Sequence, residues 1–290
     1  MKKAKVLFAF AMLMTLCCIL AACGGNWADD YCKYAQTTKN SGVKYYTVIE
    51  VLNADTVEDF VVPSEYDGLS VGSIDEGAFK ACTKLKKVTL PATIVDMDKR
   101  IFDGCIALEE VVLLSTTLDN DVEAVFAGAG TAEKVVTVTV GEGVTLIPEK
   151  LFADAENINI VFANSTPITV ADGAFANSTI KNLSVPLNVK EIGYHAYKNT
   201  DIKSVCINAG NDLYIASAAF SDCKELASVE INVASENVQN ARIQTNAFDG
   251  CTALSEIRFS GTMDEWKTIF KGDASIQFKV ICSDGEVEYQ

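Results

Sequence analysis

Residues 74–90 read IDEGAFKACTKLKKVTL, and a closely similar pattern returns at residues 243–259 as IQTNAFDGCTALSEIRF. Six more copies of the same apolar skeleton lie between these two stretches. Each copy is centred on one aromatic residue, which we call the anchor aromatic, and successive anchors are 23, 24, 26, 23, 22, 23 and 28 residues apart. A repeat of about 20 to 30 residues is typical of a solenoid, whose units bury their apolar sides against each other. The anchors are Phe79, Phe102, Phe126, Phe152, Phe175, Tyr197, Phe220 and Phe248.

The positions around each anchor also keep their character from copy to copy. The residue five places before the anchor is apolar in every copy except the third, which has Asp121. The residue three places after the anchor is always small, which indicates a tight interior site. Beginning eight or nine places after the anchor, apolar residues alternate with a period of two, which is typical of a strand with one buried face. The pattern predicts a β-rich solenoid of about eight coils with a parallel sheet.

The run from Ile74 to Pro91 resembles the BspA-like class of leucine-rich repeats found in bacterial surface proteins. The resemblance covers about residues 71–259 and implies a leucine-rich repeat stack. It also implies adhesion to host matrix or to other cells as a function. The third copy fits least well, because Asp121 takes an apolar position and GAGTA at residues 128–132 loosens the turn. We therefore expect a departure from the regular coil near residues 119–134.

The segments flanking the repeats differ from them in pattern. Residues 43–70 are rich in β-forming residues and predict an N-terminal β cap, since an open solenoid end would expose apolar surface and strand edges. Residues 260–290 predict a C-terminal cap made of a helix and a hairpin. The helix is expected from Met263 to about Phe270, because Thr262 and Glu265 have the spacing of a capping box. The hairpin is expected on either side of SDG at residues 283–285.

The chain opens with the pattern of a secretion signal. MKKAK at residues 1–5 precedes an apolar run over residues 6–20. LAAC at residues 20–23 resembles the lipobox of bacterial lipoproteins, which implies cleavage before Cys23 and a lipid on its sulfur. We expect a lipoprotein signal peptide over residues 1–22 and a linker over residues 23–42. Such a linker would hold the folded part close to its membrane.

The charge balance excludes several partners. The chain has 24 basic and 39 acidic side chains, a formal net charge of −15. Cleavage before Cys23 would remove three lysines and no acid, which makes the remainder more negative still. Nucleic acids and anionic lipid surfaces require a positive footprint, so neither is an expected partner. We expect an extracytoplasmic monomer that contacts the membrane through its lipid anchor alone.

Residues suited to catalysis or metal binding are sparse. His195 is the only histidine and no Cys-x-x-Cys pair occurs, so a cysteine and histidine zinc site is not expected. His195 could act as a general base, but a coil residue facing solvent is the simpler interpretation. The acidic run at residues 119–123 lacks the glycine and glutamate of an EF-hand. We expect no catalytic residue, no metal and no cofactor.

Most of the cysteines are expected to be structural. Four occupy the small site after the anchor, namely Cys82, Cys105, Cys223 and Cys251, where a thiol packs as a small apolar group. Neighbouring coils bring these cysteines close in pairs, but stacked side chains point in parallel, which disfavours disulfides.

The remaining candidate for function is the outward face of the strands. The leading hypothesis is a lipid-anchored cell-surface module that presents this face to a protein or glycan. The alternatives are a parallel β-helix enzyme acting on polysaccharide, a structural envelope lipoprotein without a soluble ligand, and, for the face itself, a merely solvated sheet. The candidate residues are Lys87, Thr89, Glu110, Val112, Thr137, Thr139, Asn159, Asn182, Ser184, Ser204, Ser228, Glu230 and Arg258, and Val161, Cys206 and Glu256 share the face.

Overall fold

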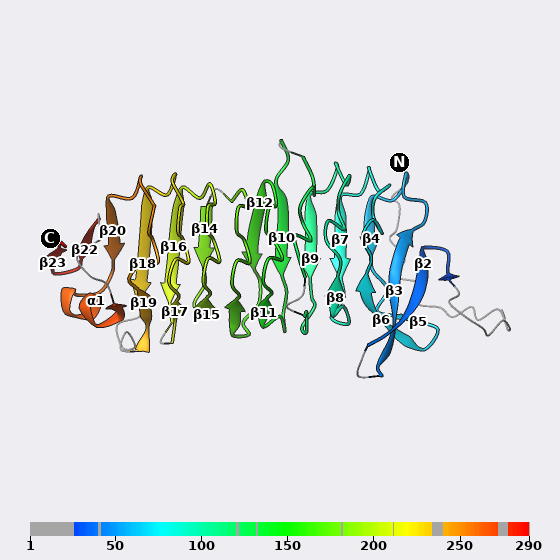
Figure 1. Ribbon diagram of the computed structural model, residues 1–290, viewed down its shortest axis with the longest axis horizontal. Helices are drawn as coiled ribbons and strands as arrows, with labels where there is room; N and C mark the ends of the chain where they lie inside the picture. The colour runs from blue at the N-terminus through cyan, green and yellow to red at the C-terminus, as the bar shows by residue number, and fades with distance from the viewer. Residues whose placement is uncertain are drawn as a thin grey trace, which may run out of the picture.

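The computed structural model describes residues 26–39, 42–119, 122–131, 133–180, 182–210, 212–233, 240–271 and 278–289. The chain winds into a long β-solenoid whose coils follow one another from the N-terminal to the C-terminal end (Figure 1). Most strand pairs are parallel, and the described part contains one short helix. The predicted fold class is therefore confirmed.

One strand from each coil contributes to what we call the front layer, which consists of two sheets. The first sheet has the order β12-β10-β9-β7-β4, and the second has the order β14-β16-β18-β20-β22-β23. The ladder is interrupted between β12 and β14. The bounds of the first sheet are β4 (Asp59–Val61), β7 (Lys87–Leu90), β9 (Glu110–Leu113), β10 (Val136–Val140) and β12 (Ile158–Phe162). Those of the second are β14 (Asn182–Val185), β16 (Ser204–Ala209), β18 (Ser228–Val233), β20 (Glu256–Phe259), β22 (Lys279–Cys282) and β23 (Gly285–Val287).

The second strand of each coil is short and belongs to what we call the rear layer. Its main sheet has the order β11-β13-β15-β17-β19-β21. At the N-terminal end, β8 pairs instead with β6 of a separate sheet. The bounds are β11 (Leu146–Ile147), β13 (Ile168–Val170), β15 (Val189–Ile192), β17 (Tyr214–Ile215), β19 (Arg242–Gln244), β21 (Phe270–Lys271) and β8 (Asp96–Met97).

The anchor aromatics form a continuous column between the two layers. Seven of them have no exposed surface, and Phe248 is 5% exposed. Neighbouring rings have centroids 4.6–5.3 Å apart, close to the spacing of about 4.8 Å between strands of a sheet. The rings are tilted by 35–44° from Phe79 to Phe152 but only by 6–11° from Phe152 to Phe248. Coil stacking thus sets the ring spacing directly.

Tight turns surround each anchor. Residues two places before and two places after it adopt positive φ in most coils, for example His195 at 57° and Asn199 at 54° on either side of Tyr197. A left-handed conformation is unfavourable for residues with a Cβ atom. Hydrogen bonds between coils offset this cost, as where the amide of Tyr197 donates to the carbonyl of Ala219 at 2.8 Å. The turns are therefore held by their neighbours in the stack.

The N-terminal region corrects the predicted linker over residues 23–42. Residues 26–28 form β1 (Asn26–Ala28), and β2 (Cys32–Thr38) pairs antiparallel with β3 (Lys44–Val51). Tyr34 of β2 is fully buried and stacks on Tyr66, with ring centroids 4.2 Å apart. The sequence pattern did not reveal β2, because its buried alternation comprises only Cys32 and Tyr34. The strands β5 (Glu65–Tyr66) and β6 (Leu69–Ile74) complete this sheet.

Residues 1–22 and Cys23 lie outside the described residues. At the other end of the chain, the helix α1 (Met263–Ile269) begins where it was predicted. Thr262 and Glu265 form both hydrogen bonds of the capping box. The indole of Trp266 is fully buried and donates to the Tyr289 hydroxyl at 2.7 Å. The predicted hairpin is present as β22 and β23, which pair antiparallel.

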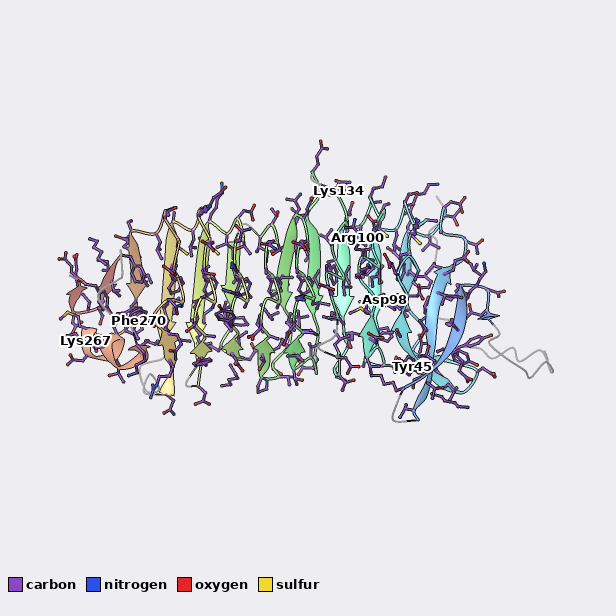
Figure 2. All side chains as sticks on the ribbon, in the orientation of Figure 1. Tyr45, Asp98, Arg100, Lys134, Lys267 and Phe270 are labelled. Atoms are coloured by element: carbon purple, nitrogen blue, oxygen red, sulfur yellow. The ribbon has the colours of Figure 1, made fainter. Side chains whose placement is uncertain are left out.

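The third repeat departs from the regular coil, as expected. The rear layer passes from β8 to β11 without a strand of the third copy among the described residues, and residues 120, 121 and 132 lie outside them. Its extra residues form a loop that projects past the neighbouring turns, with Lys134 in it (Figure 2). Lys134 pairs with Glu109 at 3.0 Å, which fastens this loop to the coil before it.

Candidate functional site

The candidate face is formed by two rows of outward side chains that run along the front layer. Buried and solvent-facing residues alternate along each strand, as in Lys87 to Leu90. The parallel register places equivalent residues of neighbouring strands side by side, so the solvent-facing residues form continuous rows. The first row contains Asp59, Lys87, Glu110, Thr137 and Asn159, then Asn182, Ser204, Ser228, Glu256 and Lys279. The second contains Val61, Thr89, Val112, Thr139 and Val161, then Ser184, Cys206, Glu230, Arg258 and Ile281.

Every candidate residue predicted from the sequence belongs to one of these rows. All of them have partly or fully exposed side chains, except that the side chain of Asn182 lies outside the described residues. The structure also adds Asp59, Val61, Lys279 and Ile281, which the repeat pattern did not identify. They lie on strands of the two caps, where no anchor aromatic marks the register.

The chemistry of the second row changes where the ladder is interrupted. From β4 to β12 the row is β-branched throughout, and its end residues Val61 and Val161 are 68% and 41% exposed. From β14 onward it carries a hydroxyl, a thiol and charged groups at Ser184, Cys206 and Glu230. The charged side chains of the second row therefore all lie beyond the gap between β12 and β14.

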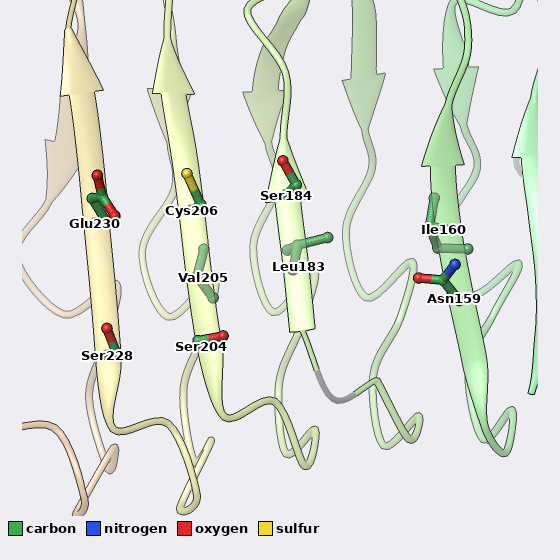
Figure 3. A pocket seen from close by; sticks show the side chains of 9 residues that line it. All are labelled: Asn159, Ile160, Leu183, Ser184, Ser204, Val205, Cys206, Ser228 and Glu230. Carbon is green, nitrogen blue, oxygen red and sulfur yellow. The ribbon is translucent and has the colours of Figure 1, made fainter.

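A groove of about 380 Å³ begins at this gap and extends over β14 and β16 to β18. Figure 3 shows its lining, with the Leu183 side chain of β14 directed toward β12. Seven of its nine lining residues lie on β14, β16 and β18, where the short side chains of serines cover little of the strand surface. The groove is lined by Asn159, Ile160, Leu183, Ser184, Ser204, Val205, Cys206, Ser228 and Glu230.

Ion pairs neutralise the basic side chains of the front layer. Lys87 contacts Glu110 at 2.7 Å, and the two lie level on β7 and β9. The Arg258 guanidinium lies 3.2 Å from Glu256 of the same strand. All four side chains are at least about a third exposed, and ion pairs at the surface contribute about 0–1 kcal/mol to stability. Their main effect is on charge, since they leave little free positive charge on the face.

The seven described cysteines are free thiols. Burial raises the pKa of Cys82 to about 11, so this thiol stays protonated and unreactive at neutral pH. Several thiols donate to carbonyls of the preceding coil, as Cys105 does to Phe79 at 3.4 Å and Cys223 to Tyr197 at 3.0 Å. The small site after the anchor therefore accommodates cysteine as a packing group, in agreement with the sequence-based interpretation.

His195 lies on the turn before Tyr197, away from the front layer. Its ring contacts that of the exposed Tyr194, with centroids 3.7 Å apart. Burial, and secondarily the charge of Lys198, lowers the pKa of the His195 imidazole. In the part of the chain that the structure describes, no three His, Cys, Asp or Glu residues are grouped to hold a metal ion. None of the helices found there is long and apolar enough to cross a membrane.

The fold and its outward strand rows are those of a leucine-rich repeat solenoid. The family model described as BspA type leucine rich repeat region, in six copies, matches residues 54–158 and 145–277. The chain therefore belongs to the BspA type leucine rich repeat family. None of the curated proteins matches the chain.

Several solved structures resemble the chain at low identity. A leucine rich cell surface protein from Faecalibacterium prausnitzii A2-165 is 14% identical, with 86% of this chain and 98% of that chain covered and a TM-score of 0.33. The leucine rich repeat protein of T. pallidum is 21% identical, with 80% and 81% covered and a TM-score of 0.35. The pneumococcal vaccine antigen PcpA is 15% identical, with 90% and 99% covered and a TM-score of 0.37.

Proposed function

We propose that this protein is a lipid-anchored cell-surface binding module whose front layer engages a protein or glycan partner. The observation that carries the proposal is the extended, solvent-facing double row of side chains across the front layer. Repeat proteins use such extended surfaces for binding, since one rigid scaffold aligns many variable positions. The side chains facing inward are buried in the core and are apolar or small in nearly every coil, so specificity must come from the outward rows.

The proposed location rests on the chain's first residues. The lipobox-like stretch ending at Cys23 supports a thioether-linked lipid that holds the solenoid at a bacterial membrane. Labelling of cells with a radioactive or clickable palmitate analogue tests this directly. The wild-type protein should incorporate the label and partition with membranes, whereas Cys23→Ser should do neither. A labelled Cys23→Ser protein would contradict the assignment.

The binding role is tested by capture of partners on intact cells. We expect a variant with Thr139→Lys and Ser184→Glu to capture fewer partners than the wild type, since these changes place charges at the centre of the second row. A matched variant with Thr169→Lys and Gln244→Glu changes the rear layer in the same way and should capture as well as wild type. Equal capture by all three proteins would show that the front layer does not bind the partner.

One assay separates this proposal from a polysaccharide-degrading activity. Incubation of the residues 24–290 form with acidic and neutral polysaccharides should release neither reducing ends nor unsaturated products. Clear turnover would overturn the binding-module proposal.

A further inference from the structure

We propose that the groove that extends over β12, β14, β16 and β18 binds the ammonium group of a lysine side chain on a protein partner, with Glu230 of β18 as the counter-ion. This inference rests on the proposed function, because it assigns a ligand chemistry to part of the same front layer.

The charge balance around the groove is the first argument. Among the described residues, the basic side chains on the front strands already lie within 4.0 Å of a carboxylate, and so do Lys86 and Lys134 beside them. Glu230 is exposed and has neither an ion pair nor a hydrogen bond to another side chain in the part of the chain that the structure describes. The charge left unbalanced at the groove is therefore negative, in a chain whose net charge is −15. The pairs are Lys86–Glu58, Lys87–Glu110, Lys134–Glu109, Arg258–Glu256 and Lys279–Glu286.

The shape and lining of the groove are the second argument. Ile160, Leu183 and Val205 contribute to its bottom, although each side chain is at least nine-tenths buried in the core, and hydroxyls of serines lie along its rim. A lysine side chain places a four-carbon stem on apolar surface while its charged head stays in polar surroundings. The ammonium has three N–H donors, so it could donate to Glu230 and also to serine hydroxyls. The volume of about 380 Å³ lies at the lower end of the usual range for ligand pockets, about 300–1,000 Å³.

The placement of Arg258 is the third argument. Arg258 lies level with Glu230 on the adjacent strand, where the two could pair. Its guanidinium instead lies 3.2 Å from Glu256. Glu256 thus holds the Arg258 guanidinium away from Glu230. This arrangement predicts opposite effects for changes at Glu256 and at Arg258.

The experiment measures fluorescence anisotropy of a fluorescein-labelled peptide with lysines separated by Gly-Ser, added to the residues 24–290 form at physiological salt. The same peptide with every lysine acetylated is the reference, and we expect it not to bind. Glu230→Gln should weaken binding of the lysine peptide by about fivefold, near the upper limit for one exposed ion pair. Glu256→Gln should also weaken binding, because Arg258 becomes free to pair with Glu230. Arg258→Gln should strengthen binding.

A matched control distinguishes a site from diffuse attraction to an acidic protein. Glu191→Gln removes the same charge from β15 in the rear layer and should leave binding unchanged. An equal loss in Glu191→Gln and Glu230→Gln would overturn the proposal, as would binding of the acetylated peptide or no binding of either peptide. Suppose that Glu230→Gln leaves the affinity for the lysine peptide unchanged, while the variant with Thr139→Lys and Ser184→Glu still captures fewer partners on cells. The proposed lysine site would then be refuted, and the proposed binding function of the front layer would remain supported.

Discussion

The rings of Tyr197 and Phe220 lie parallel in neighbouring coils, with centroids 5.1 Å apart and planes 6° apart. Tyr197 is fully buried, and its hydroxyl has no hydrogen-bond partner in the described part of the chain. Burial also raises the pKa of the Tyr197 phenol, because the ionised form would lose its hydration. The other seven anchors are phenylalanines. Tyr197 thus places a polar atom in a column that elsewhere contains only carbon.

Replacing Tyr197 by phenylalanine should stabilise the protein. A buried polar group without a partner costs roughly 1–3 kcal/mol, and Tyr197→Phe removes it while keeping the ring in the column. Urea unfolding followed by circular dichroism should show a higher midpoint at an unchanged slope. Tyr194→Phe removes a hydroxyl from an exposed ring and should change nothing. A less stable Tyr197→Phe protein would mean that the hydroxyl makes a favourable interaction.

Removing one anchor ring should destabilise the whole stack. Phe175 lies 4.8 Å from the rings on either side, so Phe175→Ala leaves a cavity bounded by two coils. We expect a loss of about 3–5 kcal/mol and a single cooperative thermal transition at a lower temperature. Phe175→Leu retains much of the volume and should lose less. Unchanged thermal unfolding of Phe175→Ala would contradict the stacked core.

The capping box of α1 gives a smaller, local prediction. Thr262 accepts a hydrogen bond from the amide of Glu265 at 3.3 Å, and the Glu265 carboxylate accepts one from the Thr262 amide at 2.7 Å. Thr262→Ala removes the first bond and should cost about 1 kcal/mol. Thr262→Ser keeps a hydroxyl and should retain most of the stability. The two variants are compared by urea unfolding, and equal midpoints would argue that the cap contributes little.

The environment of the Asp96 carboxyl leads us to expect that the stability of the protein depends on pH. Burial, and secondarily the nearby charge of Asp98, raises the pKa of the Asp96 carboxyl above its usual value. The folded state therefore binds this proton more tightly than the unfolded state does. The contribution of Asp96 to stability falls as the pH rises from the pKa of the unfolded state through the higher pKa of the folded state. Asp96→Asn removes the cost of the buried charge while keeping an acceptor for the Ser73 hydroxyl.

Asp96→Asn should therefore raise the melting temperature at pH 7, and the gain should shrink as the pH is lowered toward 4. Thermal unfolding between pH 4 and pH 7.5 tests this. Asp249→Asn, on an exposed turn, is the control and should show no such trend. A gain for Asp96→Asn that is constant across the pH range would rule out the titration of Asp96 as its cause.

Much of the fold could be predicted because the repeat is local. The anchor spacing and the alternation after each anchor identified the core strands, and Thr262 with Glu265 identified the start of α1. The strand β2 was missed because its pairing with β3 is antiparallel and lies outside the repeat, so no copy elsewhere in the chain signals it. The outward residues of β4 and β22 were missed because these strands, although they pair parallel with repeat strands, also lie outside the repeat.

The candidate site was predicted only as a set of outward positions. The spacing of the anchors does not determine whether neighbouring strands form hydrogen bonds with each other, because backbone pairing depends on the turns that lead into each strand. The interruption between β12 and β14, and the groove that extends from β12 to β18, therefore became visible only in three dimensions. The same holds for the charges, since the pairing of Arg258 with Glu256 rather than Glu230 depends on side-chain placement.

The sequence by itself determined the solenoid, its anchor column and which strand face meets solvent, because these follow from short-range periodicity repeated eight times. The tertiary structure alone decided where the front layer is interrupted, that the charged side chains of its second row lie beyond that point, and that Arg258 pairs with Glu256 rather than with Glu230. The first two features arise from contacts between coils, whose residues lie more than 20 positions apart in the chain, and the third depends on side-chain placement.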